Sequence, residues 1–240
     1  MKTLSLTNLN LFEINTALER EEEEKEEKRY GCDQNWYRTE WQRRAGCGPS
    51  AAANMLFYMS GGRAAEGGKP GRATRAAFLA LMEEVWEYVT PTDRGIPTTA
   101  LFYEPFLRYA AEKGIGVTRY GVLDMFAADV RPDAPASGEN ALIQGTPIKE
   151  TLAEAVSFIE AALAANLPVA FLNLCNGGEE NLDRWHWVTI VSLEYDGIGG
   201  ADEKAGVTIL DNGEIKNADL ALWRRTTTLG GGFVYFDLAF

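Results

Sequence analysis

The spacing of hydrophobic side chains divides the chain into a helical first part and a strand-rich second part. In the first part, apolar residues recur three and four positions apart, as on one face of an amphipathic helix. This pattern predicts helices at Pro49 to Ser60, Ala73 to Tyr88, Thr98 to Lys113 with a bend at Pro105, and Pro147 to Ala165. A proline in the first turn and glycines after the last turn support the first of these helices.

Runs of β-branched and aromatic residues, bounded by turn-forming residues, lie mostly in the second part. Such runs are typical of strands. They predict strands at 115–123, Val169 to Leu174, His186 to Leu193, Val207 to Asp211, and Gly232 to Asp237. Helices followed by strands favour an α+β fold over an alternating α/β fold. The polar and glycine-rich stretches 61–71 and 130–146 are expected to be loops, and the first lacks the residue order of a phosphate-binding loop.

A charged run separates the N-terminal residues from the rest of the chain. Residues 19–29 are almost entirely Glu, Lys and Arg, a composition typical of a solvated helix or a frayed tail. We therefore expect a charged N-terminal extension over 1–29 and one domain over 30–240. No apolar run approaches the roughly 20 residues that cross a bilayer, and the first residues lack the apolar core of an export signal. These features predict a cytoplasmic protein without a membrane span.

The net charge of the chain narrows the class of molecule that it is expected to bind. Lys and Arg total 23 against 35 Asp and Glu, which gives a net charge of −12. This balance opposes nonspecific binding to nucleic acid, because phosphate contacts need clustered cations. The three cysteines are few and odd in number, as expected of free thiols in a reducing compartment. A disulfide between Cys32 and Cys175 remains the alternative, and the oligomeric state is left open.

Cys47 stands where a thiol can be activated. It stands two residues before Pro49, at the start of the first predicted helix. The partial positive charge of a helix N-terminus favours a thiolate over a thiol. Even about 2 kcal/mol of this effect lowers a pKa by only about 1.5 units. A strongly ionised Cys47 therefore needs a second contributor, normally an imidazolium.

The chain has a single histidine, His186, which opens a predicted strand 139 positions after Cys47. Papain relatives place their histidine roughly 130–150 residues after the nucleophile. A base also needs a group that holds its tautomer, and Asp211 ends the strand expected to pair beside His186. Asn212 is the alternative orienting residue, and a simple turn at Asp211-Asn212-Gly213 is a third interpretation.

A tetrahedral intermediate needs hydrogen-bond donors aimed at its oxyanion. The backbone N–H of Cys47 is one candidate. The side-chain amide of Gln42, five residues earlier, is the other. Gln34 is an alternative that lies further back in the sequence.

Three segments resemble the papain-like clan of cysteine peptidases. The run Gln42…Cys47-Gly-Pro-Ser-Ala-Ala-Ala-Asn-Met55 is similar to its nucleophile segment, and most of all to that of the bacteriocin leader (double-glycine) peptidases, family thirty-nine. His186–Asp196 resembles the histidine strand of that branch. Val207–Asp211 resembles its aspartate strand, although Asn212 stands where that branch has a proline.

The resemblance implies a papain-like cysteine proteinase fold, with a helical half, an antiparallel sheet half and the cleft between them. It also implies Cys47 as nucleophile, His186 as base, Asp211 as orienting residue and Gln42 as oxyanion donor. The expected reaction is cleavage of a peptide or small-amide bond through a thioacyl intermediate, without a cofactor.

Two other interpretations use the same residues. A catalytically silent papain-like domain would bind a peptide or protein, because a fold does not fix an activity. A zinc site of Cys32, Cys47, Cys175 and His186 has suitable ligand types, but no closely spaced cysteine pair supports it. We therefore expect no metal.

Overall fold

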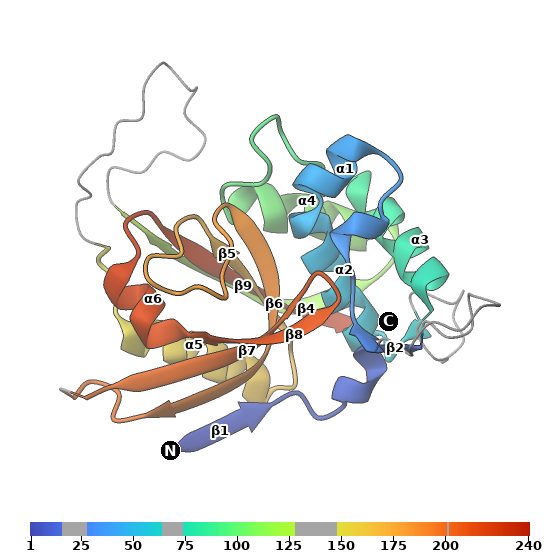
Figure 1. Cartoon of the computed structure of the whole chain (residues 1–240). Helices are drawn as coiled ribbons and strands as arrows, with labels where there is room; N and C mark the ends of the chain where they lie inside the picture. Colours follow the sequence, from blue (N-terminus) through green and yellow to red (C-terminus); the bar gives the residue numbers. More distant parts are fainter. Residues whose placement is uncertain (16–27, 64–73, 128–147, 201) are drawn as a thin grey trace.

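Strands and helices occupy separate layers in the computed structural model, which describes residues 1–15, 28–63, 74–127, 148–200 and 202–240. One antiparallel sheet forms the centre, and helices lie on both sides of it (Figure 1). The prediction of an α+β fold is therefore confirmed. Most of the predicted loops at 61–71 and 130–146, and of the charged run at 19–29, lies outside the described residues.

Four helices begin at a side chain that caps the first turn by accepting a backbone N–H. These caps are Thr39, Thr74, Thr151 and Asp219. The described helices are α1 (Glu40–Ala45), α2 (Cys47–Met59), α3 (Arg75–Trp86), α4 (Ala100–Glu112), α5 (Leu152–Ala164) and α6 (Leu220–Thr226). No described helix is both long enough and apolar enough to cross a membrane.

The four predicted helices are present as α2 to α5. Helix α2 begins at Cys47, two residues before the predicted start. Helix α5 begins five residues later than predicted, because Thr151 and Glu154 form a capping box that fixes its first turn. Pro105 lies inside α4. Helices α1 and α6 were not predicted.

The main sheet has seven strands within the described residues, in the order β4-β9-β5-β6-β7-β8, with β1 beside β6. Its strands are β1 (Lys2–Ser5), β4 (Gly116–Phe126), β5 (Val169–Asn173), β6 (His186–Asp196), β7 (Lys204–Asp211), β8 (Glu214–Asp219) and β9 (Gly230–Ala239). The five predicted strands are β4, β5, β6, β7 and β9. Strand β8 was missed because its polar composition, Glu-Ile-Lys-Asn-Ala-Asp, resembles a loop.

The first fifteen residues take part in the fold. Strand β1 pairs with β6, and β2 (Glu13–Asn15) pairs with β3 (Lys28–Tyr30) in a small second sheet. Leu6, Phe12 and Ile14 are buried in the core. The sequence predicted a charged extension over 1–29, whereas the structure places β1 and β2 before the charged run and β3 at its C-terminal end.

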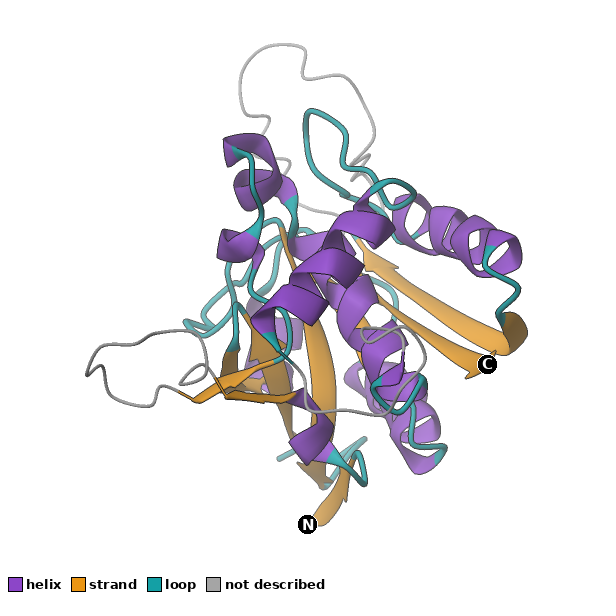
Figure 2. Cartoon of the chain, turned by 90° about the vertical axis from the view of Figure 1, so that its right-hand side faces the viewer, coloured by secondary structure: helices purple, strands orange, loops and turns teal. Residues whose placement is uncertain are grey.

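Aromatic residues bury both faces of the sheet. On one face, Phe171 of β5 stacks on Phe233 of β9 with ring centroids 4.7 Å apart, and Trp223 of α6 meets Phe171 edge-on at 4.9 Å. On the other face, Phe236 of β9 stacks on Phe106 of α4 at 4.1 Å. Helices α1 to α4 lie on this second side, in front of the strands in Figure 2. The sheet is therefore a buried layer between two sets of helices.

Candidate active site

Two glycines fix Cys47 at the first position of α2. A Cβ at Gly46 would lie 2.5 Å from the carbonyl oxygen of Gln42, and one at Gly48 would lie 2.6 Å from Cδ1 of Ile96. The first contact is with backbone, so only glycine fits at position 46 without a shift of α1. Cys47 is 9% exposed and lies at the positive end of a thirteen-residue helix.

His186 enters the site from an unusual backbone turn. Trp185, the residue before it, has φ of 55°, in the left-handed region that a bulky side chain rarely adopts. The chain then passes directly into β6, whose first residue is His186. The imidazole is buried, with 6% of the residue exposed. A strained residue at this place is consistent with a fixed direction for the neighbouring ring.

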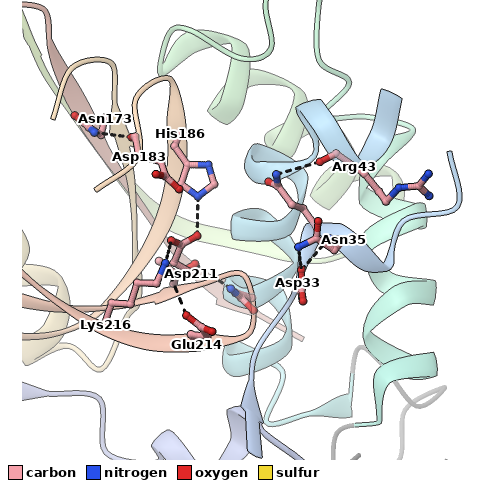
Figure 3. Close-up of polar contacts among 12 residues, drawn as sticks. Asp33, Asn35, Arg43, Asn173, Asp183, His186, Asp211, Glu214 and Lys216 are labelled. Carbon is pink, nitrogen blue, oxygen red and sulfur yellow. Dashed lines mark hydrogen bonds and ion pairs between the residues drawn. The ribbon is translucent and has the colours of Figure 1, made fainter. Parts of the chain in front are cut away.

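The carboxylate of Asp211 orients the imidazole. His186 Nε2 donates to Asp211 Oδ1 at 2.7 Å (Figure 3). Asp211 ends β7, and the structure brings it, rather than Asn212, to the ring. Because Nε2 is engaged, Nδ1 is the ring nitrogen left to face the thiol of Cys47, which lines the same pocket as His186.

A two-residue turn positions a fourth group. Asn212 and Gly213 have φ of 48° and 77°, the left-handed pair that a tight hairpin requires. The turn pairs Asp211 with Glu214, which places Lys216 diagonally across from Asp211 on the same face. Lys216 Nζ lies 2.7 Å from Asp211 Oδ2 (Figure 3). Both oxygens of the carboxylate are therefore engaged by basic groups.

The tip of this hairpin is bonded to the segment that precedes α1. Gly213 N–H donates to the carbonyl of Cys32 at 3.1 Å, and the carbonyl of Gly213 accepts from Tyr30 N–H at 2.8 Å. Asn54 of α2 accepts from Cys32 N–H at 2.8 Å and donates to Thr189 of β6 at 3.1 Å. Hydrogen bonds of the backbone and of the Asn54 side-chain amide thus join the helical and sheet sides of the site.

Gln42, the predicted oxyanion donor, has a different task. Its Oε1 accepts from the N–H and the hydroxyl of Thr39, and its Nε2 donates to Glu83 at 2.6 Å. Gln42 and Thr39 form the capping box of α1. Gln42 is therefore placed at the start of α1 and is not among the residues that line the pocket of Cys47, so its position does not fit the predicted role of oxyanion donor.

Gln34, the alternative, lines that pocket. It begins the short 3-10 helix η3 (Gln34–Trp36), which turns the chain back towards α2. Its Nε2 donates one hydrogen to the carbonyl of Arg43 at 3.1 Å. No described residue takes the second amide hydrogen in a hydrogen bond, so it is available to an oxyanion.

Electrostatic interactions favour a thiolate on Cys47 and an imidazolium on His186. Burial raises the pKa of the Cys47 thiol, but the hydrogen bond to His186, its charge and nearby backbone N–H groups outweigh burial, so the pKa lies below its usual value. Burial lowers the pKa of His186, but Asp211 and Cys47 reverse this and raise it to about 10. The pKa of Asp211 is held down against burial by His186 and Lys216. Each shift stabilises the charged form of its group.

The two other cysteines differ from Cys47. Cys175 lies outside the pocket, and Cys32 lines the pocket as a protonated thiol. All three thiols are free, so Cys32 and Cys175 form no disulfide. Cys32 lines the pocket, but burial raises its pKa well above the usual value. Cys175 accepts a hydrogen bond from Thr228 at 3.3 Å and is not a pocket residue. Cys175, one of the four ligands of the zinc interpretation, thus does not line the pocket that holds His186.

Asp183 lies on the solvent side of His186 and Asp211. Ligand atoms of Asp183, His186 and Asp211 lie within 4.8 Å of one another. Both oxygens of Asp211 are already bonded, one to His186 and the other to the ammonium of Lys216. We therefore interpret His186 and Asp211 as a hydrogen-bonded pair with Asp183 close by.

The structure brings together Cys47, His186 and Asp211, which the sequence had suggested, and adds Lys216, which sequence reasoning missed. A signal for Lys216 was present, since an Asn-Gly turn fixes the register of a hairpin and so the residue diagonal to Asp211. The arrangement of a thiol, a ring and a carboxylate can support nucleophilic attack and proton transfer. Comparison of the chain with protein-family models, curated proteins and solved structures finds no match.

Proposed function

We propose that this protein is a cysteine-dependent hydrolase of papain-like fold that cleaves a peptide or small-amide bond through Cys47, His186 and Asp211. The observation that carries the proposal is the 2.7 Å hydrogen bond from the single histidine to a buried carboxylate, with a thiol of lowered pKa in the same pocket. These groups come from α2, β6 and β7. The division into a helical side with Cys47 and an antiparallel sheet with the other two supports the papain-like assignment.

In the first half of the proposed reaction, Cys47 Sγ attacks the substrate carbonyl carbon and a C–S bond forms. The carbonyl electron pair moves onto oxygen, where the N–H of Cys47 and the free amide hydrogen of Gln34 stabilise the charge. The tetrahedral centre collapses and the C–N bond breaks. His186 gives its Nδ1 proton to the departing amine, so the thioester remains with a neutral imidazole.

In the second half, neutral His186 takes a proton from water through Nδ1, and the hydroxide attacks the thioester carbon. The C–S bond then breaks, a carboxylic acid is released and the thiolate–imidazolium pair is restored. Asp211 stays ionised throughout, because its role is to hold the ring and stabilise its charge. An amine in place of water would give transfer by the same steps.

The experiment that tests this proposal compares the alkylation rates of individual cysteines. Iodoacetamide at pH 6 to 7, followed by mass spectrometry of each peptide, is expected to modify Cys47 faster than Cys32. His186→Ala should slow Cys47 alkylation by at least about tenfold, because one pKa unit changes the thiolate fraction by that factor. Cys175 in the same sample is the internal control and should be unaffected. Cys47→Ala should abolish cleavage of a peptide library and leave the circular dichroism spectrum unchanged.

The competing function predicts a different result. A catalytically silent papain-like module that binds a peptide or protein needs no ionised pair. Slow alkylation of Cys47 that His186→Ala does not alter would contradict the hydrolase and favour that module. Rapid alkylation without cleavage of any peptide or amide would retain the nucleophile and overturn only the substrate class.

A further inference from the structure

Lys216 forms the end of a row of four ionisable groups. Its Nζ lies 2.7 Å from Oδ2 of Asp211, whose Oδ1 accepts from His186 at 2.7 Å (Figure 3). His186 in turn interacts with Cys47. The side chains of Asp211 and His186 are 2% and 8% exposed, while that of Lys216 is 30% exposed. The row thus runs from the catalytic thiol to the protein surface.

Charges alternate along this row in the active form. Thiolate, imidazolium, carboxylate and ammonium carry −, +, − and +, so each charge has only opposite charges as nearest neighbours. Without Lys216, the same three buried groups would carry a net negative charge. An uncompensated charge away from water is costly, whereas one bonded on both sides is not. Lys216 therefore balances the charge of the site.

Other charged groups lie near this row, two on strands and two in the segments before β6 and η3. Glu214 of β8 has Oε2 3.9 Å from Nζ of Lys216, and Arg29 of β3 has a guanidinium nitrogen 3.9 Å from Oε1 of Glu214. Asp183, before β6, lies close to His186 and Asp211, and Asp33 approaches the hairpin tip at Gly213. Glu214 is 58% exposed, so solvent weakens its effect on Lys216. The closest ion pair of Lys216 is with Asp211.

We propose that Lys216 is a positioning residue of this site, which fixes the Asp211 carboxylate against His186 and sets the pH range in which the thiolate–imidazolium pair exists. The inference rests on the proposed function. It extends the triad by one residue that touches no reacting atom. Lys216 acts through Asp211, and its effect should be electrostatic as well as geometric.

The sign of the electrostatic effect follows from the removal of a positive charge. Without the ammonium, both His186 and Cys47 hold their protons more tightly. The pH at which the pair forms and the pH at which it is lost should both move upward in Lys216→Met. A partly screened unit charge this close to the ring shifts its titration by about one pH unit. The more distant thiol should shift less.

The single histidine makes this shift directly measurable. Nuclear magnetic resonance of the untagged, ¹⁵N-labelled protein gives imidazole signals that belong to His186 alone. Lys216→Met should raise its titration midpoint by about one pH unit, and Lys216→Arg, which keeps the charge, should restore it. Lys204→Met removes a lysine from the far end of β7 and is the matched control. It should leave the midpoint unchanged.

Alkylation of Cys47 against pH provides the second readout. Its rising limb should move upward in Lys216→Met and stay in place in Lys216→Arg and Lys204→Met. Titration and alkylation profiles of folded Lys216→Met that superimpose on the wild type would overturn the inference. Failure of His186→Ala to affect Cys47 in the wild-type background would instead overturn the proposed function, so the two failures are distinguishable.

Glu214→Gln covers the case in which Lys216→Met does not fold. This exposed substitution removes a negative charge and leaves Lys216 in place, so the His186 midpoint should move down, by less than one unit because Glu214 is largely solvated. An unchanged or raised midpoint in Glu214→Gln would contradict the electrostatic coupling through Lys216.

Discussion

Two glutamines near the active site differ in what surrounds their amides. Gln42 is occupied on both sides, by Thr39 and by Glu83, at the start of α1. Gln34 donates to the carbonyl of Arg43 and, unlike Gln42, lines the same pocket as Cys47. The short separation from Cys47 in the sequence favoured Gln42 as the oxyanion donor. The folded chain, in which η3 carries Gln34, favours Gln34 for that role.

Alanine at each glutamine should separate catalysis from stability. Gln34→Ala is expected to slow acyl transfer to Cys47 by about 10²–10³-fold, as loss of one oxyanion donor does. Gln42→Ala should instead lower the free energy of unfolding by about 1 kcal/mol, because it removes half of a capping box. Release of p-nitrophenol from an activated ester and urea denaturation measure the two effects.

Iodoacetamide alkylation of Cys47 is the control, since it forms no oxyanion and should be equal in the wild type and Gln34→Ala. A loss of ester turnover in Gln42→Ala that exceeds the loss in Gln34→Ala would reverse the assignment of the two amides.

Candidate site residues were predictable where a local pattern fixes their environment. Cys47 precedes a helix-forming run, and His186 and Asp211 flank runs of β-branched residues, so their elements could be inferred from the sequence. Gln34 and Lys216 could not be selected in this way. Their roles depend on contacts with Arg43 and Asp211, which only the folded backbone brings about.

At the scale of elements, the junction of α1 and α2 fixes the position of Cys47. Helix α1 has six residues and several charges, so its apolar periodicity is too short to predict it. It ends at Ala45, and Gly46 is both its C-cap and the N-cap of α2, which begins at Cys47. The close approach of Gly46 to the carbonyl of Gln42 and to the ring of Tyr37 leaves no room for a side chain.

Gly46→Ala should therefore disturb both stability and the position of Cys47. Its Cβ would lie 2.4 Å from Cε2 of Tyr37 as well as 2.5 Å from the backbone oxygen of Gln42. We expect a loss of about 1–3 kcal/mol in the free energy of unfolding, as for other overpacked sites, together with slower alkylation of Cys47. Gly206→Ala, where the nearest atom is 3.5 Å away, is the control in urea denaturation. Equal effects of the two variants would show that the junction tolerates a side chain.

At the scale of the whole molecule, the N-terminus completes the sheet that carries the histidine. Strand β1 pairs with the second half of β6, through Leu4 with Leu193 and Ser5 with Ser192. The sequence concealed this pairing, because β1 is only four residues long and a charged run follows it. The long strands and amphipathic helices were predictable, and this long-range closure was not.

Leu6→Ala tests how far the N-terminal residues contribute to folding. Leu6 is 3% exposed, so truncation should lower the free energy of unfolding by about 2–3 kcal/mol through lost burial and a cavity. Leu101→Ala, at a position that is 36% exposed, should cost much less. An unchanged midpoint of urea denaturation for Leu6→Ala would mean that residues 1–15 are dispensable for the domain.

The hydrogen bond from Gly213 to Cys32 also bears on chemical ageing. Asn-Gly sequences in unfolded chains lose ammonia when the glycine nitrogen attacks the asparagine side chain, which makes such asparagines labile. Here that nitrogen donates to a carbonyl at 3.1 Å, so cyclisation at Asn212 must first break a bond that joins the two walls of the site. Deamidation would add an isoaspartyl linkage next to Asp211, and this hydrogen bond is expected to slow it in the folded state.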